Sequence, residues 1–178
     1  MSYFAAAVVR SDGGWSASEV SLTNAADVED VADRLRDLGP DADVAVLFVE
    51  SDDDYLAILR LDEGEDLRVF SPDAAFADES RIGALLLSEY AKPSVEVDAS
   101  LTSPSGLSDV EPARGARDPG DPAEAEPAGD PALLDDLGVS ASRLLELCGR
   151  EGMLPSDITA EVSTAIGAGD EVEELREA

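Results

Sequence analysis

Residues 44–70 read VAVLFVESDDDYLAILRLDEGEDLRVF, and this stretch decides the fold. Three apolar runs are separated by two acidic turns, SDDD and EGED, so the sequence predicts three consecutive antiparallel strands. The first run is apolar almost throughout, as expected of a strand that is covered on both faces. The rest of the chain is expected to be built around this unit.

The segments on either side of this unit supply two more strands and two helices. Residues 3–10 (YFAAAVVR) and 15–22 (WSASEVSL) are predicted to be strands, joined by a turn whose glycines can take positive φ. Residues 27–38 carry apolar side chains at helical spacing, and a second helix is predicted at about residues 78–90. The order β-β-α-β-β-β-α predicts an α+β fold with a mostly antiparallel sheet of about five strands and two helices.

The composition changes after residue 91. Residues 92–131 hold seven of the ten prolines and few large apolar side chains, which predicts a disordered linker. Within it, residues 95–101 (VEVDASL) are a candidate for an extra edge strand. The expected division is therefore an α+β domain over 1–91, the linker over 92–131, and a small helical unit over 132–178.

The helical unit is punctuated by helix-ending and helix-starting residues. A short helix over 132–137 is expected to stop at Gly138, Ser140 can cap the next helix, and Pro155 opens a third that stops at Gly167. Fewer than fifty residues are too few for a stable core of their own. We expect this unit to pack either against the N-terminal domain or against a partner.

The chain is acidic along its whole length. It has 41 acidic and 12 basic side chains and a net charge of −29, of which residues 1–91 contribute −15 (21 acidic, 6 basic) and residues 92–178 contribute −14 (20 and 6). Nucleic acids bind mainly through Lys and Arg, and one lysine (Lys92) with eleven scattered arginines offers no basic stripe. We expect no direct binding of nucleic acid or membranes. A basic protein surface would be attracted, although acidity also serves solubility alone.

Histidine is absent, and Cys148 is the single cysteine. This composition excludes Ser–His and Cys–His pairs, histidine metal ligands and intramolecular disulfides. Cys148 follows Leu144, Leu145 and Leu147 and is expected to be a small buried hydrophobe. No catalytic residue and no cofactor are predicted. With no signal peptide and no stretch of membrane-spanning length, the sequence predicts a soluble, cytoplasmic protein.

Six carboxylates in the two acidic turns are the candidates for a metal site. If both turns lay at one end or edge of the sheet, they would offer oxygen ligands to Mg²⁺ or Ca²⁺. No EF-hand spacing is present and turns favour Asp in any case, so solvated turns are the preferred interpretation. Trp15 and Tyr55 are predicted to be core or sheet-face aromatics. The six carboxylates are Asp52, Asp53, Asp54, Glu63, Glu65 and Asp66.

Several segments at the two ends of the chain form a recognisable set: residues 2–10 (SYFAAAVVR), 44–63 (VAVLFVESDDDYLAILRLDE), 66–74 (DLRVFSPDA), 133–148 (LLDDLGVSASRLLELC) and 152–158 (GMLPSDI). Together they resemble a bacterial family, the tRNA adenosine deaminase-associated proteins. The resemblance covers both ends of the chain and leaves the proline-rich middle outside. It implies an association with the deaminase that makes inosine at the wobble position, and it transfers no functional residues.

The chain cannot itself be that deaminase, because a zinc deaminase needs an H-x-E and a P-C-x-x-C segment. We therefore expect a non-enzymatic accessory protein that binds a protein partner, with tRNA adenosine deaminase as the candidate, through its acidic surface or its C-terminal helices. Two alternatives stay open. One is a regulatory domain that binds a divalent cation or a small molecule with its acidic turns, and the other is an enzyme that uses carboxylates alone.

Overall fold

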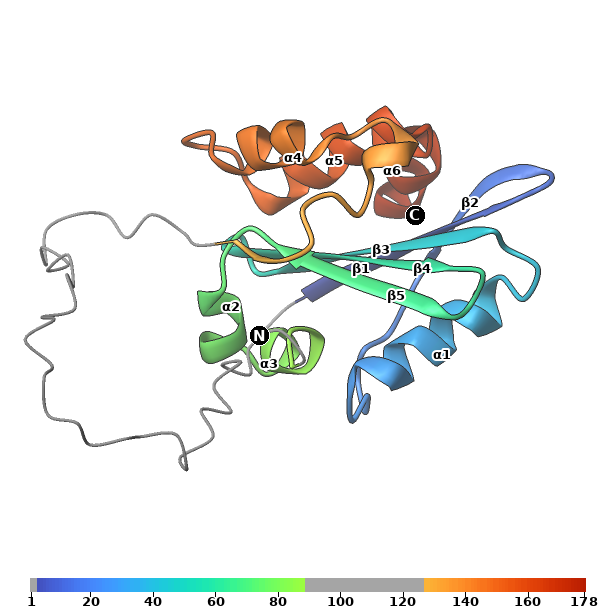
Figure 1. Ribbon diagram of the computed structural model, residues 1–178, viewed down its shortest axis with the longest axis horizontal. Coiled ribbons are helices and arrows are strands. Elements are labelled where there is room, and N and C mark those ends of the chain that lie inside the picture. The colour runs from blue at the N-terminus through green and yellow to red at the C-terminus, as the bar shows by residue number, and fades with distance from the viewer. Residues whose placement is uncertain (1–2, 89–126) are drawn as a thin grey trace, which may run out of the picture.

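A computed structural model describes residues 3–88 and 127–178 and shows a six-stranded antiparallel sheet between two layers of helices (Figure 1). The strand order is β2-β1-β3-β4-β5-β6, and every neighbouring pair is antiparallel. The predicted α+β class and antiparallel sheet are confirmed. The strands are β1 (Tyr3–Ser11), β2 (Gly14–Glu19), β3 (Val44–Ser51), β4 (Tyr55–Asp62), β5 (Asp66–Ser71) and β6 (Ala128–Gly129).

Strand β3 lies inside the sheet and is buried over all eight residues. It pairs with β1 on one side and β4 on the other, so that Val46 lies opposite Val8 and Arg60. Its side chains alternate between two apolar clusters, with Leu47 in one and Phe48 in the other. The apolar run of the sequence is therefore explained by burial on both faces.

Helix α1 (Val28–Leu38) covers one face of the sheet with the apolar stripe that the sequence predicts. Asp27 caps it by accepting a hydrogen bond from the Asp30 amide at 3.0 Å, and the helix ends at Gly39. Val31 and Leu35 are fully buried against the sheet. This helix is confirmed to within one residue.

The second predicted helix is wrong in detail, because two short helices replace it: α2 (Ala75–Glu79) and α3 (Arg81–Leu86). Ser80 breaks the helix, since its backbone is extended (φ −130°, ψ 134°) and its hydroxyl accepts a hydrogen bond from the Gly83 amide at 3.4 Å. The chain turns so tightly here that a Cβ at Gly83 would overlap the carbonyl of Phe76. Residues 89 and 90 lie outside the described residues.

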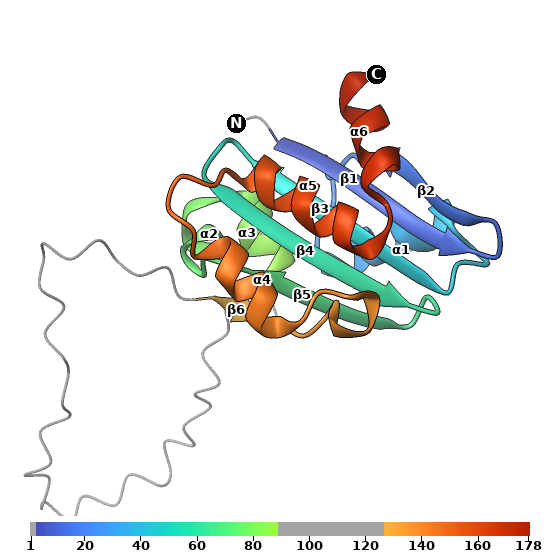
Figure 2. The same ribbon diagram turned by 90° about the horizontal axis from the view of Figure 1, so that it is seen from above.

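The C-terminal helices cover the other face of the sheet (Figure 2). The predicted helix over 132–137 shortens to a 3-10 turn, η2 (Asp135–Leu137), which Gly138 ends at φ 105°. Three helices follow, α4 (Ala141–Cys148), α5 (Pro155–Ile166) and α6 (Gly169–Glu177). Their apolar side chains pack on Phe48, Ile58 and Phe70. Of the two alternatives left open by the sequence, packing against the sheet is therefore the one observed.

Strand β6 lies within the stretch predicted to be a linker. Gly129 pairs with Phe70, and Ala128 with Ser71, at the end of β5. The expected linker is thus wrong for its last residues, which are held by the sheet. Residues 92–126, including the candidate strand over 95–101, lie outside the described residues.

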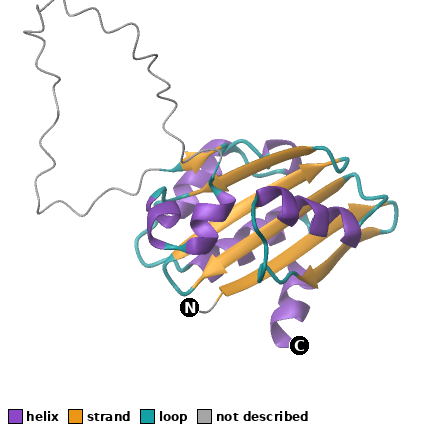
Figure 3. Ribbon diagram, turned by 90° about the horizontal axis from the view of Figure 1, so that it is seen from below, coloured by secondary structure: helices purple, strands orange, loops and turns teal. Residues whose placement is uncertain are grey.

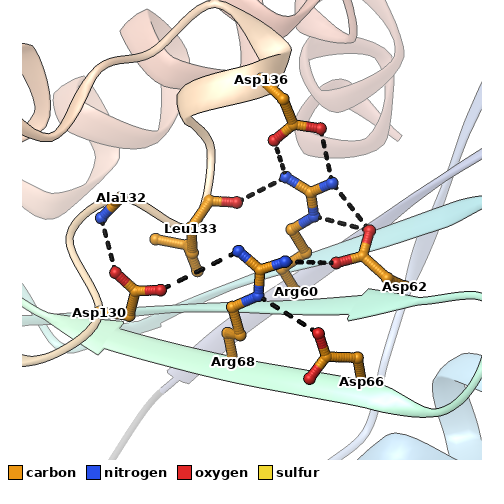
Figure 4. A network of polar contacts seen from close by, with 8 residues as sticks. All are labelled: Arg60, Asp62, Asp66, Arg68, Asp130, Ala132, Leu133 and Asp136. Carbon is orange, nitrogen blue, oxygen red and sulfur yellow. Dashed lines mark hydrogen bonds and ion pairs between the residues drawn. The ribbon is translucent and has the colours of Figure 1, made fainter.

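A buried arginine ties β4 to the C-terminal unit (Figure 4). The side chain of Arg60 is 5% exposed and donates to the Leu133 carbonyl at 2.7 Å, to Asp62 at 2.9 Å and to both carboxylate oxygens of Asp136. The Arg60 guanidinium holds the pKa of Asp136 below its usual value. Arg68 extends the network to Asp62 at 3.2 Å. These bonds fix the chain at the point where it enters the second helical layer.

Replacing Arg60 by methionine is expected to lower the free energy of unfolding by about 1–3 kcal/mol, because the buried Leu133 carbonyl loses its donor. Urea unfolding gives the free energy, and hydrogen exchange should show faster opening of α4 and α5. Arg68→Met is the matched control: its side chain is 35% exposed, so a change within about 1 kcal/mol is expected. Equal losses for both variants would contradict a special role for Arg60.

Replacing Gly83 by alanine is expected to cost about 2–3 kcal/mol of unfolding free energy, because the new methyl group meets the Phe76 carbonyl. Gly13→Ala is the control, since a Cβ there has no neighbour within 4 Å, and its effect should stay within about 0.5 kcal/mol. Thermal unfolding followed by circular dichroism separates the two. A neutral Gly83→Ala variant would show that α2 and α3 do not pack as described.

Candidate functional site

The two acidic turns do not form one site. Asp52, Asp53 and Asp54 follow β3, whereas Glu63 and Glu65 follow β4. Consecutive turns of a meander lie at opposite ends of the strand they share, so the two turns do not meet at one end of the sheet and the condition for a joint cation site is not fulfilled. Asp66 starts β5 and lies 3.6 Å from Arg68. Over residues 3–88 and 127–178, no group of three or more acidic or cysteine side chains is placed to hold a metal ion.

Cys148 sits on the inner side of α4, beside the apolar cluster that contains Leu144 and Leu147. Burial raises the pKa of its thiol to about 12. A thiol with such a pKa stays protonated at neutral pH and is a poor nucleophile. It packs as a small hydrophobe, although its side chain is half-buried and not fully buried as expected.

Trp15 and Tyr55, the two aromatic residues considered in the sequence, both pack against other side chains of the fold. Trp15 packs against the apolar cluster under the C-terminal helices. Tyr55 stacks on Phe76 with a ring-centroid distance of 5.0 Å, and its hydroxyl donates to Glu79. The hydrogen bond to Glu79 raises the pKa of Tyr55 to about 12. Both side chains are partly buried and pack on other apolar side chains.

A pocket of about 280 Å³ opens between α3 and the loop that leads into α1, and its lining is mostly apolar. The Tyr3 hydroxyl in its wall accepts from the Leu22 amide at 2.8 Å. Among the described residues no carboxylate lines this pocket, so these residues do not offer the facing acids that a carboxylate enzyme requires.

A second, open hollow of about 290 Å³ does contain carboxylates, at the end of β3. Glu50 is the buried one, with 7% of its side chain exposed, and it is bound by Arg176 of α6. The guanidinium of Arg176 also lies 4.7 Å above the ring of Phe4. Glu50 therefore anchors α6 to the sheet and is not an unpaired general base.

The outward side of α6 is the most acidic helical surface of the C-terminal unit. Its single cation, Arg176, is turned toward Glu50, so it does not offset the helix's own carboxylates. Figure 3 shows α6 standing out from the body of the molecule near the C-terminal end of the chain. The carboxylates of α6 are Asp170, Glu171, Glu173, Glu174 and Glu177.

The acidic helix lies beside an open edge of the sheet. Helix α6 contacts β1 and β2, and β2 is the last strand of the sheet on that side. Among the described residues, no strand pairs with the outer side of β2. This corner was not predicted from the sequence, because strand order is set by contacts between distant segments. The available signal was the second strand itself, which is short, polar and rich in small side chains.

Cys148 should react with iodoacetamide at pH 8 about a thousandfold more slowly than a thiol of pKa 9, because its thiolate fraction is smaller by that factor. Mass spectrometry of the folded chain measures the rate. The same chain in denaturant is the control and should react at the ordinary rate. Fast labelling of the folded protein would restore Cys148 as a candidate nucleophile.

No helix among the described residues is long and apolar enough to cross a membrane.

Comparison with known proteins places the chain in a family. No curated protein matches the chain, and no solved structure matches it. The family model described as "Rv3753c-like tRNA adenosine deaminase-associated protein" matches residues 3–169, which include the sheet, α4 and α5. The chain belongs to this family of tRNA adenosine deaminase-associated proteins.

Proposed function

We propose that this chain is a non-enzymatic accessory protein that binds tRNA adenosine deaminase in the cytoplasm through the acidic corner formed by α6 and β2. The family description supplies the partner, since it names an associated protein and not the deaminase. The absence of histidine and the single cysteine exclude the zinc chemistry of the deaminase from this chain.

The observation that carries the proposal is the uncompensated charge of α6. Four carboxylates of α6, Asp170, Glu173, Glu174 and Glu177, are exposed and Glu171 is partly exposed, while the one arginine is held by Glu50. An enzyme that acts on tRNA must present Lys and Arg to the phosphates. The two surfaces are therefore complementary in charge, and such complementarity steers encounter and fixes orientation. Bound in this way, the chain would either hold the enzyme in place or compete with tRNA for its basic face.

The apolar faces of the C-terminal helices are not available for this contact. Leu144, Ile158 and Val162 are buried on the sheet. The large apolar side chains that remain exposed on this unit are Leu145 and Leu154, at 38% and 45%. Binding by this unit must therefore use its polar outer surface, which favours a charge-guided complex.

Neutralising Glu173, Glu174 and Glu177 to glutamine is expected to weaken binding to purified tRNA adenosine deaminase by about tenfold, mainly through slower association. Surface plasmon resonance gives both rates. Raising the salt from about 50 to 300 mM should weaken the native complex in the same way.

The control variant neutralises Glu63, Glu65 and Asp78, which lie away from α6. Both variants carry a net charge of −26, three fewer negative charges than −29, so they separate local from overall charge. The control is expected to change the dissociation constant by less than about threefold. If native protein does not bind the deaminase at low salt, the proposed function is wrong.

A further inference from the structure

We propose that the free edge of β2 receives an extended segment of the partner, which adds to the sheet as a further strand. This inference rests on the proposed function for the identity of the partner, tRNA adenosine deaminase. It goes further by naming the surface and the kind of segment that binds there.

The hydrogen-bond pattern of the sheet shows which backbone groups of β2 face outward. The Val20 amide donates to the Ala5 carbonyl at 2.8 Å, so Ala5 and Val20 form a bonded pair. Bonded and non-bonded pairs alternate along an antiparallel ladder. The backbone N–H and C=O groups of Trp15, Ala17 and Glu19 therefore point away from β1, toward the open edge.

A hydrogen bond on the other side of β1 agrees with this assignment of inward and outward backbone groups. There the Asp43 amide donates to the Arg10 carbonyl at 3.0 Å. Arg10 is the register partner of Trp15, and its carbonyl points away from β2, as the alternation requires. Three outward donors and three outward acceptors thus remain along β2, at alternate residues over a length suited to a short peptide strand.

Nothing in β2 blocks pairing at this edge. Proteins protect edge strands with lysine, proline, bulges or a covering segment. Strand β2 contains neither lysine nor proline, and its exposed Ser16 and Ser18 side chains are small. At the opposite edge of the sheet, by contrast, the end of β5 is already paired with β6. There the Asp130 amide also donates to the Val69 carbonyl at 2.9 Å.

A groove next to the end of β2 indicates what the added segment carries. It is an open hollow of about 360 Å³ between β2 and α1, and Leu38 in its wall is 39% exposed. Glu19 and Asp37 are exposed in the same wall, and Arg34, which also lines it, donates to the Ser21 and Thr23 carbonyls. Added strands are selected by pockets for alternate side chains. The groove fits an apolar side chain flanked by lysine or arginine.

Charge decides between the possible occupants of the edge. A second copy of this chain would bring another net charge of −29 to the corner where α6 already carries five carboxylates. Like charges of this size disfavour self-association. A basic extended segment is attracted to the same corner. We therefore assign the edge to a partner segment that combines β-forming apolar residues with basic ones.

The test replaces Ala17 by proline, which removes one outward donor without breaking a bond to β1, and proline is tolerated on edge strands. Binding to tRNA adenosine deaminase is expected to weaken about tenfold or more. Ala17→Ser keeps the N–H and is the matched control, with a change of less than about twofold. Circular dichroism confirms that both variants fold. If the proline variant does not fold, Leu38→Asp tests the groove, with an expected loss of about fivefold or more.

The outcomes are distinct. If native chain does not bind the deaminase, both the proposed function and this inference are overturned. If native chain and a folded Ala17→Pro variant bind equally, this inference is overturned and the proposed function stands. Slow hydrogen exchange of the Ala17 amide in the free chain would also overturn it, because the edge would already be paired. So would a dimer in solution that Ala17→Pro converts to a monomer.

Discussion

The fold depends on burying β3 on both of its faces. All eight of its residues are buried, and because its neighbouring strands lie in the same sheet, other segments must cover its two faces. Helix α1 supplies part of the cover on one side, and segments more than eighty residues away supply it on the other. Arg60 joins the second layer to the sheet by binding the backbone at Leu133 and the side chain of Asp136. The C-terminal helices are therefore part of the core.

Local signals in the sequence predicted the elements, whereas contacts between distant segments decided the details. The apolar run of β3, the stripe of α1 and the helix stops at Gly138 and Gly167 are encoded within a few residues, and each was found where expected. The two-residue strand β6 has no periodicity to detect, since its pairing partner decides its structure. The break at Ser80 was missed because its cap competes with an otherwise regular helical pattern.

The composition indicated what kind of chemistry to expect at the candidate site, but it did not indicate where in the fold the site lies. Charge and the missing histidine pointed to binding and away from catalysis, and both follow from composition. The two acidic turns lie at opposite ends of β4, as the geometry of a meander requires, so the condition for a shared cation site is not met. The open edge at β2 required the strand order, and the inward turn of Arg176 required the contact between α6 and Glu50. The short, polar second strand is a weak local sign of the edge, whereas nothing local indicates the direction of Arg176.

The shared core has a consequence for how the chain is made. Val46, Phe48 and Ile58 lie on a sheet face that only later segments cover, with Val172 among the last buried residues. During synthesis, the finished meander must therefore wait with that face open to water until the C-terminal helices have left the ribosome. Such an interval exposes a nascent chain to aggregation. The high negative charge, which keeps neighbouring nascent chains apart, suits a protein whose hydrophobic interior closes so late.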